Sequence, residues 1–263
     1  MDLLTKSSAS NASVKPLRQI SVVIIALNEA ERITNAIQSC QAFADEIVVV
    51  DGGSQDNTMQ IAKAFGCQVY QNPWSGYAKQ RNLGAAWAKF DWIFFIDADE
   101  AVDQQLSTAL LDWKQYLQVK ARAFQCDRIG DFLDGWLQSR PESHIRLYDK
   151  TVFQIKNVLV HESVEVNAAP VGRLPGTILH QGFRNISDTV MRFNLYTDLD
   201  AQESYNQGKR FNYWRLLLKP PAKFLQMYLW NYLWQQGVGG FTVSILWSYY
   251  IFLKEIKLYE LEP

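Results

Sequence analysis

Residues 92–99 read Trp-Ile-Phe-Phe-Ile-Asp-Ala-Asp, a short apolar run that ends in two carboxylates, Asp97 and Asp99. Aromatic and β-branched residues in such a run predict a buried β-strand. The strand would deliver both acids to the carboxyl edge of a sheet, where open α/β sheets bind their ligands. Carboxylate oxygens suit a hard divalent cation, which can also bind a substrate diphosphate. An EF-hand is excluded, because Val102 stands where that loop needs glycine and Thr108 where it needs glutamate.

The chain upstream of this strand alternates between buried strands and helices. Continuous β-branched runs are typical of strands that are buried on both faces. The predicted strands span 20–26, 46–50, 67–70 and 92–96, and the helices between them begin near Asn28, Asp56 and Ala78. This alternation predicts βαβ units and a mostly parallel sheet flanked by helices, which is an α/β fold.

Two changes in the pattern divide the chain into regions. Residues 1–19 are polar and Ser-rich and lack the apolar centre of a signal peptide, so we expect a disordered lead-in. Residues 20–206 form the predicted α/β domain, in which 20–100 is regular and 101–206 has short alternating strands and a final helix. Residues 207–263 carry four of the nine tryptophans and six of the twelve tyrosines, which predicts a separate helical appendage.

Composition excludes several classes of protein. A net charge of -1 provides no basic field for nucleic acid, so we expect no nucleic-acid partner. Hydrophobic residues make up 48% of the chain, enough for a sizeable core. Cys40, Cys67 and Cys126 are scattered and lack CxxC spacing. They are typical of reduced thiols in a cytosolic protein rather than of a disulfide framework or a zinc site.

The appendage contains a long stretch without charge, from Phe224 to Leu253. Its length raises the question of a transmembrane span. Amide side chains and Gly237–Gly240 interrupt the stretch, however, and each remaining apolar piece is short for a crossing. Tryptophan and tyrosine settle at headgroup depth, and lysines and arginines flank the stretch on both sides. An amphipathic anchor at the membrane surface is therefore expected, with packing on the α/β domain or a dimer contact as the alternative.

Phosphate-binding loops are missing from the chain. No GxGxxG follows the first strand and no GxxxxGK[ST] occurs anywhere, which disfavours dinucleotide binding and P-loop chemistry. Asn28 and Glu29 follow the first predicted strand instead, and Asp51 ends the second. Such oxygens can accept hydrogen bonds from a base N–H or from ribose hydroxyls. Binding of the substrate's phosphates would require the metal and nearby cationic side chains, and Lys79 and Arg81 are the candidate cations.

Four motifs in this order resemble the signature of family 2 inverting glycosyltransferases. They are Ser21–Glu29, Val49–Thr58, Gln80–Asn82 and Asp97–Asp99. Later segments are similar to the branch of β-glucosyltransferases that act on the lipopolysaccharide inner core. These segments are Arg146–Tyr148, Val160–Glu162, His180 and Arg192–Asn194.

The resemblance implies a GT-A fold, a nucleotide-sugar donor and a divalent metal, Mg or Mn. We expect a UDP-sugar, bound in the half spanning 20–100. The implied donor-binding residues are Asn28, Glu29, Asp51, Lys79, Arg81 and Asp97. Asp99 would ligate the metal, and His180 is a candidate second ligand, with a structural histidine as the alternative.

The residues for the acceptor are less marked. The Thr-Glu-Asp and Gln-x-x-Arg-Trp motifs of processive relatives are absent, so the general base must lie elsewhere. Glu162 is our candidate base, and a solvated glutamate at a strand end is the alternative. Arg140, Arg146 and His161 are candidates for acceptor binding, with surface arginines and a structural histidine as alternatives.

The expected function is transfer of a sugar to a lipid-linked saccharide acceptor, in lipopolysaccharide core biosynthesis. The protein would be cytoplasmic and peripheral on the inner face of the cytoplasmic membrane. A polyprenyl-phosphate sugar synthase is an alternative within the transferases. A non-catalytic membrane scaffold with a vestigial donor pocket is an alternative from another class.

Overall fold

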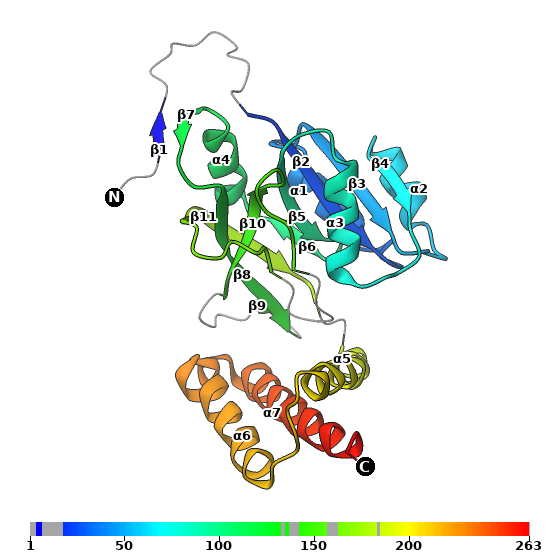
Figure 1. Ribbon diagram of the computed structural model, residues 1–263, viewed down its shortest axis with the longest axis vertical. Coiled ribbons are helices and arrows are strands. Elements are labelled where there is room, and N and C mark those ends of the chain that lie inside the picture. The colour runs from blue at the N-terminus through cyan, green and yellow to red at the C-terminus, as the bar shows by residue number, and fades with distance from the viewer. Residues whose placement is uncertain are drawn as a thin grey trace. The chain divides into compact units, whose positions relative to one another are not determined.

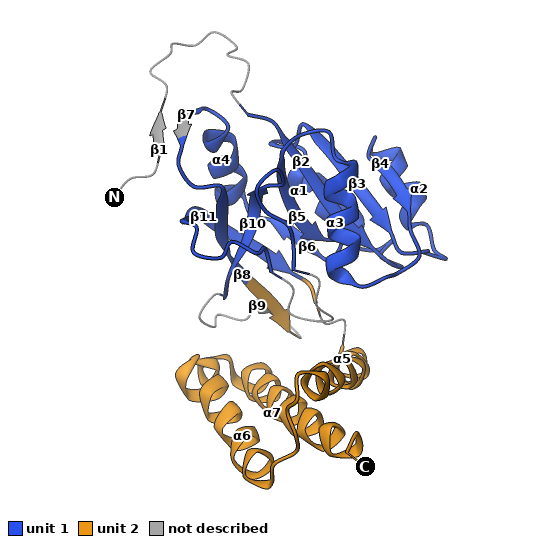
Figure 2. Cartoon of the chain, viewed as in Figure 1, with its two compact units in different colours: residues 1–128, 142–180 blue, residues 129–141, 181–263 orange. Residues whose placement is uncertain are grey.

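The computed structural model describes residues 4–6, 18–132, 135–136, 142–156, 163–182 and 185–262. The chain forms two compact units, coloured separately in Figure 2. Unit 1 comprises residues 1–128 and 142–180, and unit 2 comprises residues 129–141 and 181–263. The long helix α5 (Ile186–Asn206) therefore belongs with the C-terminal helices by its contacts, whereas the sequence pattern groups it with the α/β domain.

A mixed sheet dominates unit 1 and confirms the predicted fold class (Figure 1). Four strands are parallel: β4 (Gln68–Gln71), β3 (Glu46–Asp51), β2 (Ile20–Ala26) and β5 (Trp92–Asp97). The sheet continues from β5 through β10 (Glu142–Asp149), β8 (Ala123–Phe132), β11 (Val171–His180) and β6 (Glu100–Val102). The short β9 (Gly135–Trp136) pairs with β8, and β1 (Leu4–Lys6) pairs with β7 (Tyr116–Val119) apart from this sheet.

Helices cover both faces of the sheet. Successive residues of β2 point to opposite sides, and because all of them are buried, both faces need a covering layer. Val22 and Ile24 pack in one core cluster with α1 (Ile33–Cys40), α2 (Thr58–Ala64) and α4 (Gln104–Trp113). Val23 and Ile25 pack in a second cluster with α3 (Tyr77–Trp87). Asp103 caps α4 by accepting a hydrogen bond from the N–H of Leu106 at 2.7 Å.

One part of the predicted antiparallel region is less regular than its sequence suggests. Residues 145–148 lie in β10, whereas within the described part of the chain 153–155 and 164–166 contribute a single bridge, between Ile155 and Val164. On the side away from Val164, the backbone of Ile155 is bound by the side chain of Asn82. Its amide nitrogen donates to the Ile155 carbonyl at 2.8 Å, and its oxygen accepts from the Ile155 N–H at 3.1 Å. A side chain from α3 thereby takes the place of a neighbouring strand.

Unit 2 is a helical assembly. Beside α5 it contains α6 (Tyr213–Leu225), the turns η1 (Gln226–Trp230) and η2 (Leu233–Gln236), and α7 (Gly237–Glu260). Its core holds Phe193, Leu233, Val243 and Tyr250. Among the described residues, no helix combines the length and the apolar character that a membrane crossing requires.

Candidate functional site

Parallel pairing brings the predicted acidic residues to one edge of the sheet. β2 lies between β3 and β5, with Ala26 opposite Asp51 and Ile25 opposite Asp97. Asp51 and Asp97 therefore end strands that are two positions apart, or about 10 Å at the usual strand spacing. The loop that follows β2 and carries Asn28 and Glu29 emerges between them. This edge is where an open α/β sheet binds a ligand.

Asp51 is fully buried, and within the described part of the chain only one of its carboxylate oxygens has a hydrogen-bond partner. Oδ1 accepts from the backbone N–H groups of Gly53 and Ser54, at 2.9 and 2.8 Å. Oδ2 has no hydrogen-bond partner among the described residues. A buried acceptor in this state is costly and calls for a donor. The arrangement fixes the carboxylate and leaves one oxygen for a ligand N–H or hydroxyl group.

The loop after β2 is fastened to the loop after β3. Asn28 has a φ of 56° and its N–H donates to Ser54 Oγ at 2.8 Å. The Asn28 side-chain oxygen accepts from the N–H of Gln55 at 2.8 Å. The N–H of Glu29 donates to Thr58 Oγ1 at 2.8 Å. Asn28 thus shapes the loop after β2, and these contacts hold Asn28 and Glu29 beside the loop that follows Asp51.

Arg32 joins Glu29 to the acidic motif. Its Nε and Nη2 atoms donate to the two oxygens of Glu29, each at 2.6 Å. Its Nη1 lies 3.7 Å from Asp99 Oδ2. Arg32 is not among the residues predicted from the sequence motifs. Its position three residues after Glu29, where the next helical turn begins, is a signal that could have identified the ion pair.

Asp97 ends β5 and pairs with an arginine from α3. Arg81 is buried, and its Nη2 lies 2.5 Å from Asp97 Oδ1. Burial raises the pKa of Asp97, and the charge of Arg81 opposes this shift. Lys79 is exposed on the same helix, two residues before Arg81 and therefore on a different side. Of the two predicted phosphate-binding cations, the structure brings Arg81 to the acidic motif.

Asp99 lies beside His180 because β6 pairs with β11. The antiparallel register sets His180 opposite Glu100, and His180 Nε2 lies 3.5 Å from Asp99 Oδ2. Burial opposes ionisation of Asp99, but His180 and Arg32 outweigh it and lower its pKa. The described residues contain no group of three or more acidic, histidine or cysteine side chains arranged to hold a metal ion. A carboxylate and an imidazole fit a divalent ion that also takes oxygens from a substrate diphosphate.

Glu100 is a buried carboxylate surrounded by arginines. It accepts from Arg146 Nη1 and Nη2 at 2.8 and 2.7 Å and from Arg128 Nε at 2.7 Å. Its Oε2 also accepts from the backbone N–H of Asp97 at 3.0 Å. Burial would raise the pKa of Glu100, but the two arginines hold it well below its usual range. Arg146, a predicted acceptor-binding residue, is thus buried in contact with Glu100, and its role toward an acceptor stays a prediction.

Three predicted residues cannot be placed. Arg140, His161 and Glu162 lie outside the described residues. The roles predicted for them, in acceptor binding and as general base, remain predictions.

Comparison with known proteins supplies the family. Residues 21–169 match glycosyl transferase family 2. An uncharacterized glycosyltransferase of Rickettsia typhi is 31% identical over 93% of this chain and 88% of its own length. The lipopolysaccharide core biosynthesis glycosyltransferase LpsC of Rhizobium meliloti is 28% identical over 93% of both chains.

Among solved structures, glucosyl-3-phosphoglycerate synthase from Mycobacterium tuberculosis, crystallised with Mn²⁺, UDP and phosphoglyceric acid, resembles part of the chain. It is 28% identical over 42% of this chain and 43% of that one, with a TM-score of 0.36. The family match covers more than half of the chain, including Glu29, Asp51, Asp97 and Asp99. The protein therefore belongs to glycosyltransferase family 2.

Proposed function

We propose that the protein transfers a sugar from a nucleotide-sugar donor to a lipid-linked saccharide, with inversion at the anomeric carbon. The observation that carries this proposal is the acidic edge of the sheet. There, Asp51 Oδ2 is buried and has no hydrogen-bond partner among the described residues, and Asp51 ends β3 two strand positions from Asp97. Asp99 follows Asp97 by two residues and pairs with His180. The similarity to LpsC supports an acceptor in the lipopolysaccharide core.

Asp51 would bind the base of the donor. Its Oδ2 can accept a hydrogen bond from an N–H group, such as that of uracil, and this would satisfy the buried oxygen. The N–H groups of Gly53 and Ser54 keep the carboxylate in place before the donor arrives. A UDP-sugar is accordingly the donor that we expect.

Asp99 and His180, with Asp97 beside them, would hold Mg²⁺ or Mn²⁺ together with the diphosphate of the donor. When bound, the ion stabilises the negative charge that develops on the leaving diphosphate. Arg81 holds Asp97, and Arg32 lies between Glu29 and Asp99. Both guanidinium groups place positive charge beside the acids, which favours entry of an anionic donor.

Glu162 would take the proton from the acceptor hydroxyl as its oxygen attacks the anomeric carbon. Arg140 and His161 would bind the acceptor. The resemblance to the lipopolysaccharide branch supports these roles. Replacing Glu162 with glutamine tests the base: we expect transfer to fall at least a hundredfold, as is usual for a lost general base. Near-normal turnover would contradict this role.

The acceptor also suggests where the protein works. A lipid-linked saccharide lies at the surface of a bilayer, so we place the enzyme at the cytoplasmic face of the inner membrane. The uncharged aromatic stretch of unit 2, from Phe224 to Leu253, supports this placement.

Hydrolysis or transfer of UDP-, GDP- and ADP-sugars by the full chain, with and without Mn²⁺, tests the proposal. We expect one donor class to be consumed only with metal, and Asp97→Asn to abolish consumption. Asp103→Asn is a matched control, because Asp103 caps α4 and asparagine caps a helix equally well. Metal-independent consumption, or equal activity in both variants, would contradict the proposal.

A further inference from the structure

Helix α6 carries a stripe of exposed apolar side chains. Trp214, Leu217, Leu218 and Leu225 recur at helical spacing, and Leu229 in η1 continues the row. Each of these side chains is between 52% and 70% exposed. Residues three, four, seven and eleven positions apart share one side of a helix. Unit 2 thus leaves one apolar side of α6 uncovered.

Helix α7 carries a second stripe of the same kind. Val238, Phe241, Ile245, Tyr249 and Phe252 follow each other at intervals of three or four residues. Their side chains are between 40% and 79% exposed. The opposite side of α7, with Val243 and Tyr250, is buried in the core of unit 2.

Aromatic contacts join the two stripes. The ring of Phe241 lies 5.7 Å from that of Phe224 and 5.8 Å from that of Tyr228, measured between centroids. Phe224 and Tyr228 in turn stack at 5.3 Å. Phe241 belongs to the α7 stripe, and the other two rings come from the α6–η1 segment that carries the other stripe, so this seam joins the two helices. We call the two stripes together the apolar face. Exposed apolar surfaces of this extent mark interaction sites.

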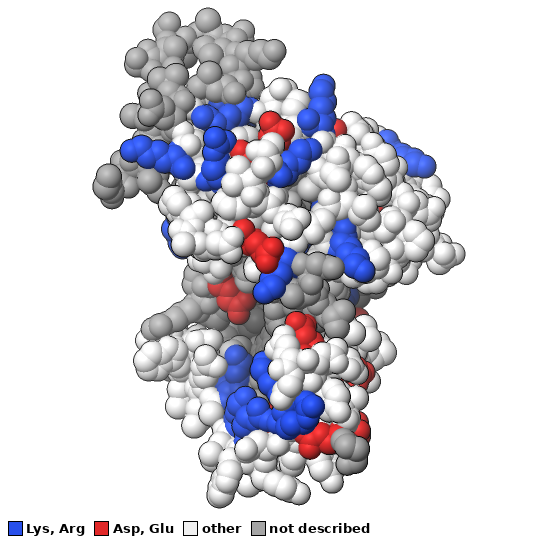
Figure 3. Space-filling view, in the orientation of Figure 1, with Lys and Arg blue, Asp and Glu red and all other residues white. Residues whose placement is uncertain are grey.

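The charged residues on α6 and directly before it are all basic. Arg215, Lys219 and Lys223 lie on α6, with Lys209 and Arg210 just before it. No aspartate or glutamate occurs between Glu203 and Glu255. Figure 3 shows lysine and arginine side chains of unit 2 gathered in one group. Glu255, on α7, lies 3.1 Å from Arg215.

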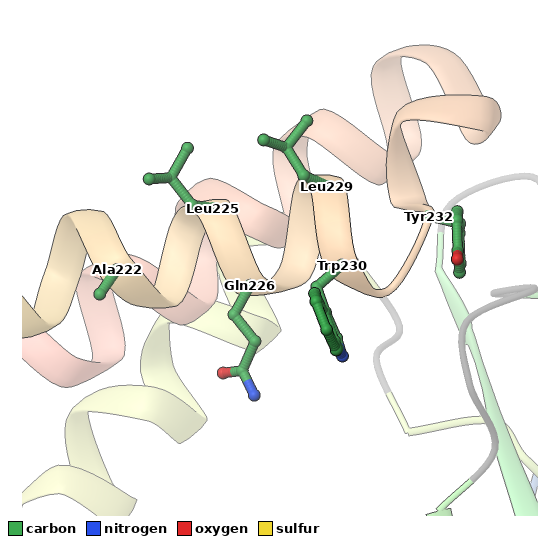
Figure 4. A pocket seen from close by; sticks show the side chains of 6 residues that line it. All are labelled: Ala222, Leu225, Gln226, Leu229, Trp230 and Tyr232. Atoms are coloured by element: carbon green, nitrogen blue, oxygen red, sulfur yellow. The ribbon is translucent and has the colours of Figure 1, made fainter.

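A hollow of about 590 Å³ adjoins the apolar face. It is lined by Ala222, Leu225, Gln226, Leu229, Trp230 and Tyr232. Leu225 and Leu229 project to one side of the helix, and Gln226 and Trp230 to the other (Figure 4). Tryptophan and tyrosine next to leucine are typical of the boundary between headgroups and acyl chains.

We infer that the apolar face and its basic rim dock on an anionic lipid bilayer, with α6 and α7 lying in the headgroup region. Apolar side chains would enter the acyl boundary while the lysines and arginines meet lipid phosphates. A second copy of the chain fits less well, since a symmetric pair would bring together the lysines and arginines of two α6 helices, and Glu255 is already paired with Arg215. This inference names the membrane contact of the proposed function, but the contact itself requires no sugar transfer.

Flotation of the full chain with lipid vesicles tests the inference. We expect binding to vesicles of phosphatidylethanolamine and phosphatidylglycerol, and weaker binding to pure phosphatidylcholine. Leu218→Glu with Leu225→Glu should lower the partition coefficient more than tenfold. Lys219→Gln with Lys223→Gln should lower it about twenty-fivefold, or about fivefold for each lysine. Leu111→Glu is the control, because Leu111 is 40% exposed on α4 of unit 1 and should leave binding unchanged.

Equal flotation of wild type and both double variants would overturn the inference. The inference would also be overturned if sedimentation showed a dimer that the leucine substitutions dissociate while flotation stays unchanged. Hydrolysis of the donor sugar in solution, measured on the same variants, separates this result from the proposed function. If the double variants no longer float but still hydrolyse the donor, membrane docking is supported. If the wild type floats but does not hydrolyse the donor, the result counts against the proposed function alone.

Discussion

Glutamine in place of Glu100 should destabilise unit 1 strongly, although the change removes little more than a charge. Glu100 is almost completely buried and its oxygens accept from Arg146 and Arg128 at 2.7–2.8 Å. Removing one partner of a buried ion pair typically costs 3–5 kcal/mol, because the other charge stays uncompensated. Arg146 is buried but Arg128 is partly exposed, so water can offset part of the loss. We therefore expect a loss of about 3 kcal/mol in the free energy of unfolding.

Urea denaturation, monitored through hydrogen exchange of the backbone amides in β5 and β10, measures this loss in unit 1. Arg146→Met in the Glu100→Gln background should restore part of the stability, since the stranded charge is removed as well. Because the folded-state pKa of Glu100 lies below that of an unfolded glutamate, its carboxylate contributes fully above about pH 4.3. The contribution is lost as the pH falls through the folded-state pKa. The difference between wild type and variant should thus be constant from about pH 6 to 8 and narrow below about pH 4. A loss under about 1 kcal/mol at pH 7 would refute the reasoning.

Two further predictions concern packing in unit 1. Gly84→Ala should cost about 1–3 kcal/mol in urea denaturation, because the added methyl group would overlap Cγ1 of Val23 where α3 meets β2; an unchanged midpoint would contradict this packing. The thiols should react slowly with iodoacetamide at pH 8 in the folded protein, because burial raises the pKa of Cys40 and Cys126 to about 12 and that of Cys67 to about 11. Mass spectrometry should find all three labelled only after unfolding, and rapid labelling of Cys40 or Cys126 in the native state would count against their burial.

The regular half of the fold could be predicted from the sequence because its signals are local. Apolar runs such as Ile20–Ala26 define strands buried on both faces, and the acids at their ends then share one edge by the geometry of parallel sheets. The register of β2 with β3 and β5 confirms this expectation. The neighbours of Asp97 and Asp99 could also be predicted in part, since Arg81 and His180 were both candidate site residues from the sequence.

What the sequence could not provide are contacts between distant segments. Glu100 meets Arg128 and Arg146 only after β6, β8 and β10 have taken their places in the sheet. Ile155 looks like part of a strand, yet the side chain of Asn82, 73 residues away, binds its backbone. The predicted partition at residue 206 follows composition, whereas α5 packs with α7 through contacts that composition does not encode.

Calorimetric titration of UDP into the full chain tests the central claim most directly. That claim is that Asp51 binds the base while Asp99 and His180 hold a divalent ion at the diphosphate. UDP should bind wild type more tightly with Mn²⁺ than without it. Asp99→Asn should remove the effect of the metal and keep the weaker metal-free binding. Asp51→Asn should weaken binding under both conditions, because the oxygen that accepts from the base is changed. UDP affinity that is unaltered by Mn²⁺ and by both substitutions would contradict the account.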